Sequence, residues 1–146
     1  MTTPHSEEVL QLPRIGDERG NLSFVEGGRH VPFAVQRVYW IYDVPGGEMR
    51  GGNAHRAFDE FLIALSGSFD VHLENGARSW TVSLNRSYYG VLVPRMTWRR
   101  LDNFSTNAVC LVLASAHFDE AQYIRDHDVF RGEARAQRAG ELNRPS

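Results

Sequence analysis

The chain has 146 residues, a hydrophobic content of 42% and a formal net charge of −2 at pH 7. The length fits one domain with an ordinary core, and the small charge gives no electrostatic case for nucleic acid as a partner. A single cysteine, Cys110, excludes an intramolecular disulfide, and neither a signal peptide nor a run of ~20 apolar residues is found, so we expect a cytoplasmic protein that does not enter a membrane.

The predicted elements are many short β-strands. Residues 36–43 (QRVYWIYD) are rich in aromatic and branched side chains and run into a Pro-Gly-Gly turn, and the apolar run 61–65 is typical of a strand covered on both faces. Over 69–84, two alternating segments flank Asn75-Gly76, the preferred pair of a type I′ hairpin turn. Further strands are expected at 89–93 and 108–114. Strands at this spacing predict an all-β sandwich or barrel.

The C-terminal part of the chain differs in composition. Asp119 can cap a short helix that runs through Tyr123 and Ile124, with Gln122 placed for the reciprocal bond. Residues 131–146 (RGEARAQRAGELNRPS) have almost nothing to bury, so we expect a polar, flexible tail there. The predicted organisation is therefore one domain over residues 1–130, followed by the tail at 131–146.

The segment 47–67 carries the most informative spacing. Gly47, Asn53, His55, Glu60 and Gly67 stand at the intervals of the first cupin motif, which has a histidine where this chain has Asn53. In a metal-binding cupin, the two histidines and the glutamate of this motif are ligands. The chain thus resembles a cupin in the spacing of this motif but lacks one of its metal ligands.

The second cupin motif also matches in spacing, and it lacks a further metal ligand. Pro94, Arg99 and Asn103 occupy its positions, with Arg99 in the place of the fourth ligand. Arginine is a permanent cation without a lone pair to donate, and His55 with Glu60 alone makes a poor divalent site opposite such a charge. We therefore predict a cupin, a double-stranded β-helix or jelly-roll barrel, with no metal and no other cofactor.

Residues 17–130 resemble the sugar nucleotide 3,4-ketoisomerases through four segments in the same order: DERGNLSFVE, VPFAVQRVYWIYDVPGGEMRGGNAHR, VPRMTWRRLDNFS and CLVLASAHFDEAQYIRDHDVF. The resemblance implies an isomerase that converts dTDP-4-oxo-6-deoxyglucose to its 3-oxo isomer. The product would feed an aminotransferase that makes an amino-deoxy sugar for a surface polysaccharide or glycoprotein. The resemblance also implies a homodimer whose N-terminal strands exchange between subunits, and catalysis without metal.

This isomerisation needs a base for the C3 proton and a relay that moves a proton between two oxygens through an enediol. Histidine suits both roles, and residues i and i+2 of a strand project from one face into one barrel mouth. In the family the first histidine of the pair is the carbon base and the second the oxygen relay, and these positions are Asn53 and His55 here. The Asn53 carboxamide has no basic lone pair, and losing a general base costs about 10² to 10⁴ in rate, so we expect impaired activity. Asn53 belongs either to a natural, weakened or repurposed homologue or to an engineered His-to-Asn variant.

Five further residues match substrate-binding positions of the family. Arg19 matches the position from which the N-terminal strand enters a site, where a cation polarises the keto oxygen, although the alternative is a surface charge in a turn. Arg99 matches a position that lines the site. Tyr39 and Arg50 match barrel positions near the sugar and diphosphate, and an aromatic in such a strand is otherwise a core residue. Glu60 either fixes the tautomer of the neighbouring histidine or lies at the rim, turned to water.

Two other classes of function stay open at this point. Asn53 alone favours a non-catalytic nucleotide-sugar-binding cupin. A metallocupin oxygenase or isomerase is disfavoured by Asn53 and Arg99 together. For the ketoisomerase itself, the sequence leaves open whether the product has the galacto or the gluco configuration at C4.

Overall fold

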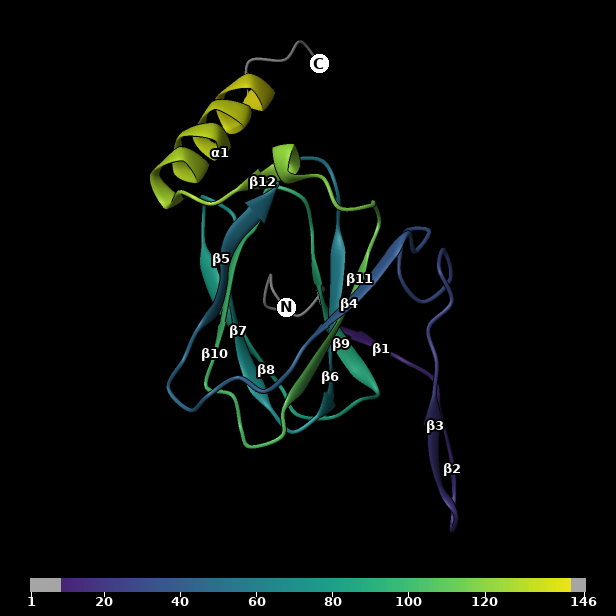
Figure 1. Ribbon diagram of the computed structural model, residues 1–146. Coiled ribbons are helices and arrows are strands. Elements are labelled where there is room, and N and C mark those ends of the chain that lie inside the picture. The colour runs from purple at the N-terminus through teal and green to yellow at the C-terminus, as the bar shows by residue number, and fades with distance from the viewer. Residues whose placement is uncertain (1–8, 143–146) are drawn as a thin grey trace.

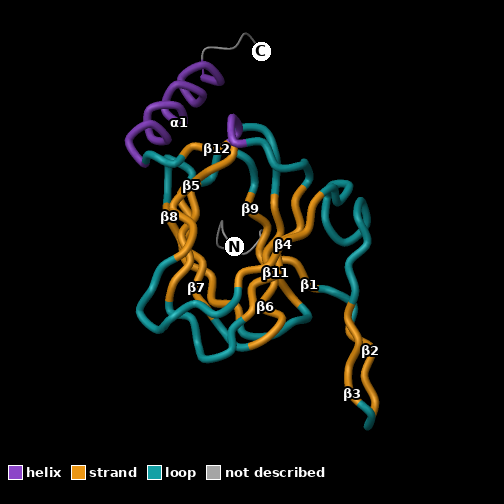
Figure 2. The backbone as a smooth tube through the Cα atoms, viewed as in Figure 1, coloured by secondary structure: helices purple, strands orange, loops and turns teal. Residues whose placement is uncertain are grey.

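The computed structural model describes residues 9–142, whose strands form two five-stranded antiparallel sheets that face each other and a separate two-stranded hairpin (Figures 1 and 2). In the first sheet the order is β1-β9-β6-β11-β4. Its strands are β1 (Val9–Gln11), β4 (Arg37–Ile41), β6 (Glu60–Ser66), β9 (Tyr89–Val93) and β11 (Val109–Ala114). In the second sheet the order is β12-β5-β10-β7-β8. Its strands are β5 (Arg50–His55), β7 (Phe69–Glu74), β8 (Ser79–Leu84), β10 (Trp98–Asp102) and β12 (Tyr123–Ile124).

The main core lies between the two sheets, because apolar residues alternate along the strands and turn inward together. In β7, for example, Phe69, Val71 and Leu73 are buried while the residues between them are half-exposed. The side chains of this core include Leu62, Ala64, Phe69, Val71, Leu73, Leu84, Val91, Val93, Leu101, Cys110 and Val112. Cys110 is thus the buried small hydrophobe that a cysteine in an apolar run predicts, and burial raises the pKa of its thiol to about 12.

Strand β6 is covered on both faces, as its continuous apolar run predicts. Leu62 and Ala64 join the core between the sheets, whereas Phe61 and Ile63 belong to a second cluster with Leu113. This second cluster lies on the opposite face of the first sheet, since side chains alternate across a strand. The two clusters explain why β6 has no polar face.

The N-terminal hairpin projects away from the barrel. Strands β2 (Arg14–Asp17) and β3 (Gly20–Ser23) pair only with each other, and all their residues are exposed (Figure 1). Ile15 and Leu22 face each other across the hairpin and are 63% and 57% exposed. An isolated two-stranded hairpin is marginally stable in water, so this arm needs a surface to rest on.

The turn between β7 and β8 differs from the predicted two-residue type I′ turn. The strands end at Glu74 and Ser79, and residues 75–78 form a four-residue loop. The Asn75 side chain accepts hydrogen bonds from the backbone N–H groups of Ala77 and Arg78, at 2.9 and 3.0 Å. Asn75 therefore stabilises the turn through hydrogen bonds to its side chain as well as through its preference for turn conformations. Side-chain hydrogen bonding to the backbone is the second reason why asparagine is common in turns.

The C-terminal segment also differs from its prediction. Asp119 caps a single turn of 3₁₀ helix, Glu120–Gln122, and accepts a hydrogen bond from the backbone N–H of Ala121 at 3.1 Å. The chain then becomes extended instead of helical, because Tyr123 and Ile124 pair with β5. Helix α1 (His127–Leu142) follows, where the sequence analysis expects a flexible tail from residue 131; residues 143–146 lie outside the described part.

Helix α1 is stabilised by a narrow apolar stripe and by ion pairs. Phe130 and Ala134, four residues apart, are buried against Ala54 and Ile124. Glu133 accepts hydrogen bonds from the Nη2 and Nε atoms of Arg56, at 2.8 and 3.0 Å. These two apolar residues are too few for the composition of the segment to predict a packed helix, although their i, i+4 spacing is that of one helix face.

The architecture confirms the predicted all-β cupin barrel with a helix near its C-terminal end. Helix α1 lies beyond one end of the barrel and reaches it through β12 (Figure 1). In residues 9–142, no helix combines the length and the apolar character that crossing a membrane requires.

Candidate functional site

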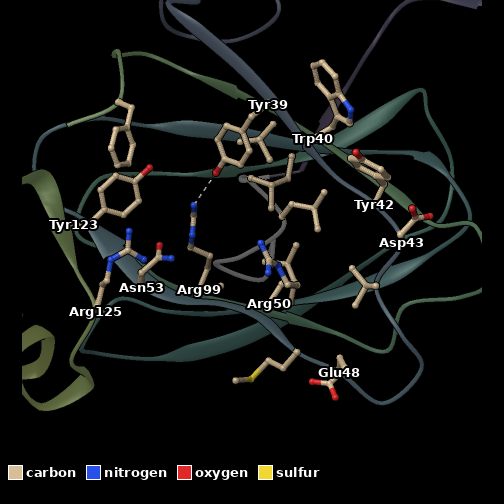
Figure 3. A pocket seen from close by; sticks show the side chains of 18 of the residues that line it. Tyr39, Trp40, Tyr42, Asp43, Glu48, Arg50, Asn53, Arg99, Tyr123 and Arg125 are labelled. Carbon is tan, nitrogen blue, oxygen red and sulfur yellow. Dashed lines mark hydrogen bonds between the residues drawn. The ribbon is translucent and has the colours of Figure 1, made fainter. Parts of the chain in front are cut away.

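A cavity of about 710 Å³ lies between the two sheets at one end of the barrel. Its walls come from β4, β5, β10 and β12 and from the loop between β4 and β5 (Figure 3). This size is within the usual range for a site that encloses a small organic ligand. The charged side chains that line the cavity are Arg37, Arg50, Arg99, Arg125, Asp43 and Glu48. Arginine outnumbers the carboxylates in this lining, which favours an anionic ligand.

Arg99 is held at the cavity by a buried network with Glu60 and Tyr39. The Arg99 Nη2 atom lies 2.5 Å from Glu60 Oε1 and donates to the Tyr39 oxygen at 3.2 Å. The Tyr39 hydroxyl lies 3.1 and 3.0 Å from the two Glu60 oxygens. Glu60 is fully buried, so neither of its predicted roles holds: it is not at the rim, and it lies 3.8 Å from His55, too far for a hydrogen bond.

The network keeps Arg99 charged. Burial alone opposes the charged form, but Glu60 and Tyr39 outweigh it and hold the pKa of Arg99 above its ordinary value. Burial also raises the pKa of Tyr39, so this phenol stays protonated at neutral pH. The Nε and Nη1 atoms of Arg99 are buried and have no hydrogen-bond partner within residues 9–142. Buried donors are rarely left unpaired in proteins, so these two point to a ligand oxygen in the cavity.

Asn53 lies directly opposite Arg99. The two residues pair across β5 and β10, and Asn53 lines the cavity (Figure 3). The register shifts after this pair, so that Gly52 is an extra residue at φ +77° and Gly51 approaches β10 closely. A Cβ on Gly51 would lie 3.2 Å from the Arg99 carbonyl oxygen. The bulge therefore directs the Asn53 side chain toward the part of the cavity where Arg99 lies, and its Oδ1 atom is buried with no hydrogen-bond partner in residues 9–142.

His55 is buried and is not among the residues that line the cavity. Its ring stacks on Phe58, with centroids 4.1 Å apart, and meets Tyr123 edge-on at 4.8 Å. In the described residues neither ring nitrogen has a hydrogen-bond partner. Burial, followed by the charges of Arg99, Arg37 and Arg125, shifts the pKa of His55 far below its ordinary value. The shared face of Asn53 and His55 thus brings only Asn53 to the cavity, and the catalytic role of His55 remains a prediction.

The low pKa of His55 predicts a free energy of unfolding that decreases as the pH is lowered below about 6.5. Below about pH 6.5 the unfolded chain binds a proton at His55 and the folded chain does not, so acidification favours unfolding down to the low folded pKa. We expect this group to contribute about 1 kcal/mol per pH unit to the slope of unfolding free energy against pH. Urea unfolding between about pH 7 and about pH 5 measures it. The neutral variant His55→Gln should lose that part of the slope, and the exposed control His117→Gln should keep it; equal slopes for the two variants would contradict the prediction.

Arg50 and Arg19 occupy different surroundings. Arg50 lines the cavity, as predicted. Arg19 is at the end of the β2–β3 hairpin, its side chain is 86% exposed, and its guanidinium lies 2.7 Å from Asp17. Arg19 is therefore outside the cavity of its own chain.

The cavity lining also contains residues that the sequence analysis does not single out as site residues, among them Arg37, Tyr123 and Arg125. Arg37 lies two residues before Tyr39 on β4, so strand periodicity alone places both on one face. Tyr123 and Arg125 had no such signal, because Tyr123 was assigned to a helix and only the pairing of β12 with β5 brings it to the site. Arg37 Nη1 donates to the Tyr123 oxygen at 2.9 Å and connects β4 with β12.

One group of possible metal ligands lies outside the cavity, on the outer face of the second sheet. The candidate ligand atoms of Asp70, His72 and Asp102 lie within 4.8 Å of one another. The His72 ring is already engaged on both sides, 2.6 Å from Asp102 and 2.9 Å from Thr81, and Asp70 accepts from Ser83 at 2.6 Å. The cluster is thus a satisfied hydrogen-bond network.

Comparison with known proteins gives consistent relatives. The family model described as FdtA: WxcM-like, C-terminal matches residues 5–135. The chain is 36% identical over 124 residues to a TDP-4-oxo-6-deoxy-alpha-D-glucose-3,4-oxoisomerase of Aneurinibacillus thermoaerophilus, covering 85% of this chain and 89% of the relative. A histidine-to-asparagine mutant of the 3,4-ketoisomerase QdtA from Thermoanaerobacterium thermosaccharolyticum, solved with TDP-4-keto-6-deoxyglucose, is similar at a TM-score of 0.86 and 33% identity, covering 88% of this chain and 94% of that one. The WlaRB TDP-quinovose 3,4-ketoisomerase of Campylobacter jejuni is similar at a TM-score of 0.81 and 40% identity, with coverages of 85% and 95%.

Proposed function

Because this chain belongs to the FdtA family (WxcM-like, C-terminal), we propose that it is a sugar nucleotide 3,4-ketoisomerase, which moves the carbonyl of a TDP-linked 4-oxo-6-deoxy sugar from C4 to C3. The relatives named as TDP-sugar 3,4-isomerases support both the reaction and the substrate class. The structural observation that carries the proposal is Arg99, buried and charged, with two unpaired donors at a cavity.

We assign Arg99 to the stabilisation of the developing enediolate. Removal of the C3 proton places negative charge on the O4 atom of the sugar, and fixed donors that face this oxygen lower the barrier without having to reorganise. Glu60 and Tyr39 hold the guanidinium in place, so that its Nε and Nη1 atoms remain for the substrate. Arg50 adds positive charge to the cavity wall, which suits the diphosphate of a sugar nucleotide.

Asn53 takes the place of the carbon base and limits the rate. It lies opposite Arg99, where a group that removes a proton next to the carbonyl has to be, but its carboxamide does not accept a proton at neutral pH. The QdtA mutant with asparagine in place of a histidine holds TDP-4-keto-6-deoxyglucose, which supports substrate binding without the imidazole. The chain is accordingly a ketoisomerase scaffold with a weakened proton-transfer step.

Proton NMR of TDP-4-oxo-6-deoxyglucose in D₂O tests the function. With Asn53→His, the C3 proton signal should disappear as deuterium enters the sugar, and signals of the 3-oxo isomer should grow. If this variant binds the nucleotide sugar yet neither exchanges the C3 proton nor forms the 3-oxo isomer, a non-catalytic binding protein becomes the better account.

We propose further that two copies of the chain form a homodimer in which the β2–β3 hairpin of each exchanges onto the other. Ile15 and Leu22 on the hairpin are exposed, and Val38, Trp40 and Leu65 are exposed on the first sheet. Covering such apolar side chains is a common driving force for association. The exchange would also bring Arg19 to the cavity of the partner, since it does not reach its own.

Mixed dimers test the shared site. In an Asn53→His background, we expect Arg19→Ala and Arg99→Met each to lower the rate about 10- to 1,000-fold, because each removes a cation from the substrate oxygens. If Arg19 acts in the partner's site, unfolding and refolding the two variants together should restore about a quarter of the sites. Light scattering should show a dimer, and Ile15→Asp with Leu22→Asp should give a monomer. If mixed dimers recover no activity, Arg19 does not act in the partner's site, and the proposed exchange is contradicted.

A further inference from the structure

Tyr123 is a cavity residue that the mechanism above does not use. It pairs with His55 across β12 and β5, and the two rings meet edge-on. Since residues two apart on a strand share a face, Tyr123, His55 and Asn53 lie on the same face of the second sheet. Figure 3 shows the Tyr123 hydroxyl pointing into the cavity, toward the side where Tyr39 and Arg99 lie.

The hydrogen bond from Arg37 determines where the Tyr123 proton can point. Arg37 Nη1 lies 2.9 Å from the Tyr123 oxygen, and a guanidinium only donates. The phenol oxygen is therefore the acceptor in this bond, and its own hydrogen is directed elsewhere. In residues 9–142 no acceptor receives that hydrogen, so it is available to a ligand in the cavity.

Tyr39 is in the opposite situation, although it lines the same cavity. Its hydroxyl lies within hydrogen-bond distance of both Glu60 oxygens, and its oxygen accepts from Arg99. The Tyr39 proton is thus committed to a carboxylate. Of these two phenols, Tyr123 is the one that can pass a proton to a bound sugar.

On the basis of the ketoisomerase function proposed above, we propose that Tyr123 is the catalytic residue that moves a proton between the two sugar oxygens. Once a base has taken the C3 proton, as the imidazole at position 53 does in the Asn53→His variant, the Tyr123 O–H bond breaks and its proton passes to O4 of the enediolate. The phenolate then takes the proton of the O3 hydroxyl, which leaves Tyr123 neutral again. The electron pair on O3 forms the C3 carbonyl, and the electrons of the C3–C4 double bond take the proton that the base returns to C4. No oxidant or reductant is needed.

Two arginines suit Tyr123 to this exchange. Arg37 donates to the phenol oxygen, and the Arg125 guanidinium lies 4.7 Å from the centre of the Tyr123 ring, fixed there by two bonds to Glu120. Both positive charges stabilise a transient phenolate. His55, to which the family resemblance assigns the relay, does not line the cavity and has no partner for either ring nitrogen within residues 9–142.

The test compares two rates in one NMR experiment, with Asn53→His as the parent. Tyr123→Phe keeps the ring packing and removes the exchangeable proton. In D₂O we expect its C3 exchange to stay within about twofold of the parent, because the base still forms the enediolate, while 3-oxo formation falls about 100-fold. Tyr89→Phe loses a hydroxyl that lies outside the cavity and binds Asn85, and it should change neither rate.

Arg37 supplies a second variant that does not depend on Tyr123 itself. Arg37→Met removes the donor to the phenol and should lower 3-oxo formation more than C3 exchange, whereas Arg37→Lys keeps a donor and should recover part of the loss. Equal loss of both rates in Tyr123→Phe, or unchanged 3-oxo formation, would overturn the relay. If the Asn53→His parent shows neither exchange nor isomerisation, the ketoisomerase function itself fails, and this outcome is distinct because it occurs with Tyr123 in place.

Discussion

Asn53→His is expected to raise the rate of 3-oxo product formation about 10²- to 10⁴-fold, the range that a positioned general base contributes. The position is ready for an imidazole, because the β5 bulge already aims residue 53 at Arg99 and the cavity. Neither the buried Glu60–Arg99 pair nor the Tyr39 hydrogen bond has to change. Product formation is measured by proton NMR under saturating substrate, with the unmodified chain as the reference.

The increase in the rate of product formation should come from the ability of residue 53 to accept a proton, and not from the size or shape of its side chain. Asn53→Gln, which extends the amide without adding a base, should remain at the level of the unmodified chain. In Asn53→His the rate should fall on acidification between about pH 7 and about pH 4, because burial and the facing Arg99 charge hold the pKa of an imidazole at this position below its ordinary value of about 6.5. A similar gain in Asn53→Gln, or a rate in Asn53→His that is flat across this pH range, would show that residue 53 does not act as the base.

Glu60→Ala is expected to lower the free energy of unfolding by about 3–5 kcal/mol, because it leaves the Arg99 charge buried without its partner. Glu60 is fully buried, and Arg99 is nearly so. The variant also removes the acceptor of the Tyr39 hydroxyl, so a second buried polar group loses its bond. Urea unfolding monitored by circular dichroism measures the change.

An ion pair near the surface provides the matched control. Glu133 binds Arg56 with similar geometry, at 2.8 Å, but both side chains are more than a third exposed, so Glu133→Ala should cost at most about 1 kcal/mol. Replacing the whole buried pair, as Glu60→Leu with Arg99→Met, should restore much of the stability lost in Glu60→Ala while abolishing catalysis. A Glu60→Ala chain as stable as Glu133→Ala would mean that Arg99 can turn its charge to water.

The sequence predicted the barrel and half of the site, for a clear physical reason. Strand periodicity and motif spacing are local properties of the sequence, so they indicate the strands and mark Asn53 and Arg99, and the family resemblance adds Tyr39 to the same site. The same pattern does not tell how deep a side chain lies. His55 shares the face of Asn53, yet packing between Phe58 and Tyr123 removes it from the cavity.

The residues that were missed depend on pairing between distant segments. Tyr123 looked like part of a capped helix, and only the edge of β5, which offers unpaired backbone groups, makes it a strand. Helix α1 was assigned to a flexible tail, because Phe130 and Ala134 are few and their partners lie on other elements. The composition of a segment indicates only how much apolar surface that segment could bury by itself. These two segments bury little apolar surface unless they pack on the barrel.

The order of strands in the first sheet also determines when the chain can fold during synthesis. Strand β11 lies between β4 and β6, so these two early strands cannot join one sheet until residue 114 is available. A nascent chain that ends before β11 therefore presents open edges on both β4 and β6, together with the apolar side chains of β6. Such edges recruit strands from other chains, so incomplete chains should aggregate and depend on chaperones until this central strand is inserted.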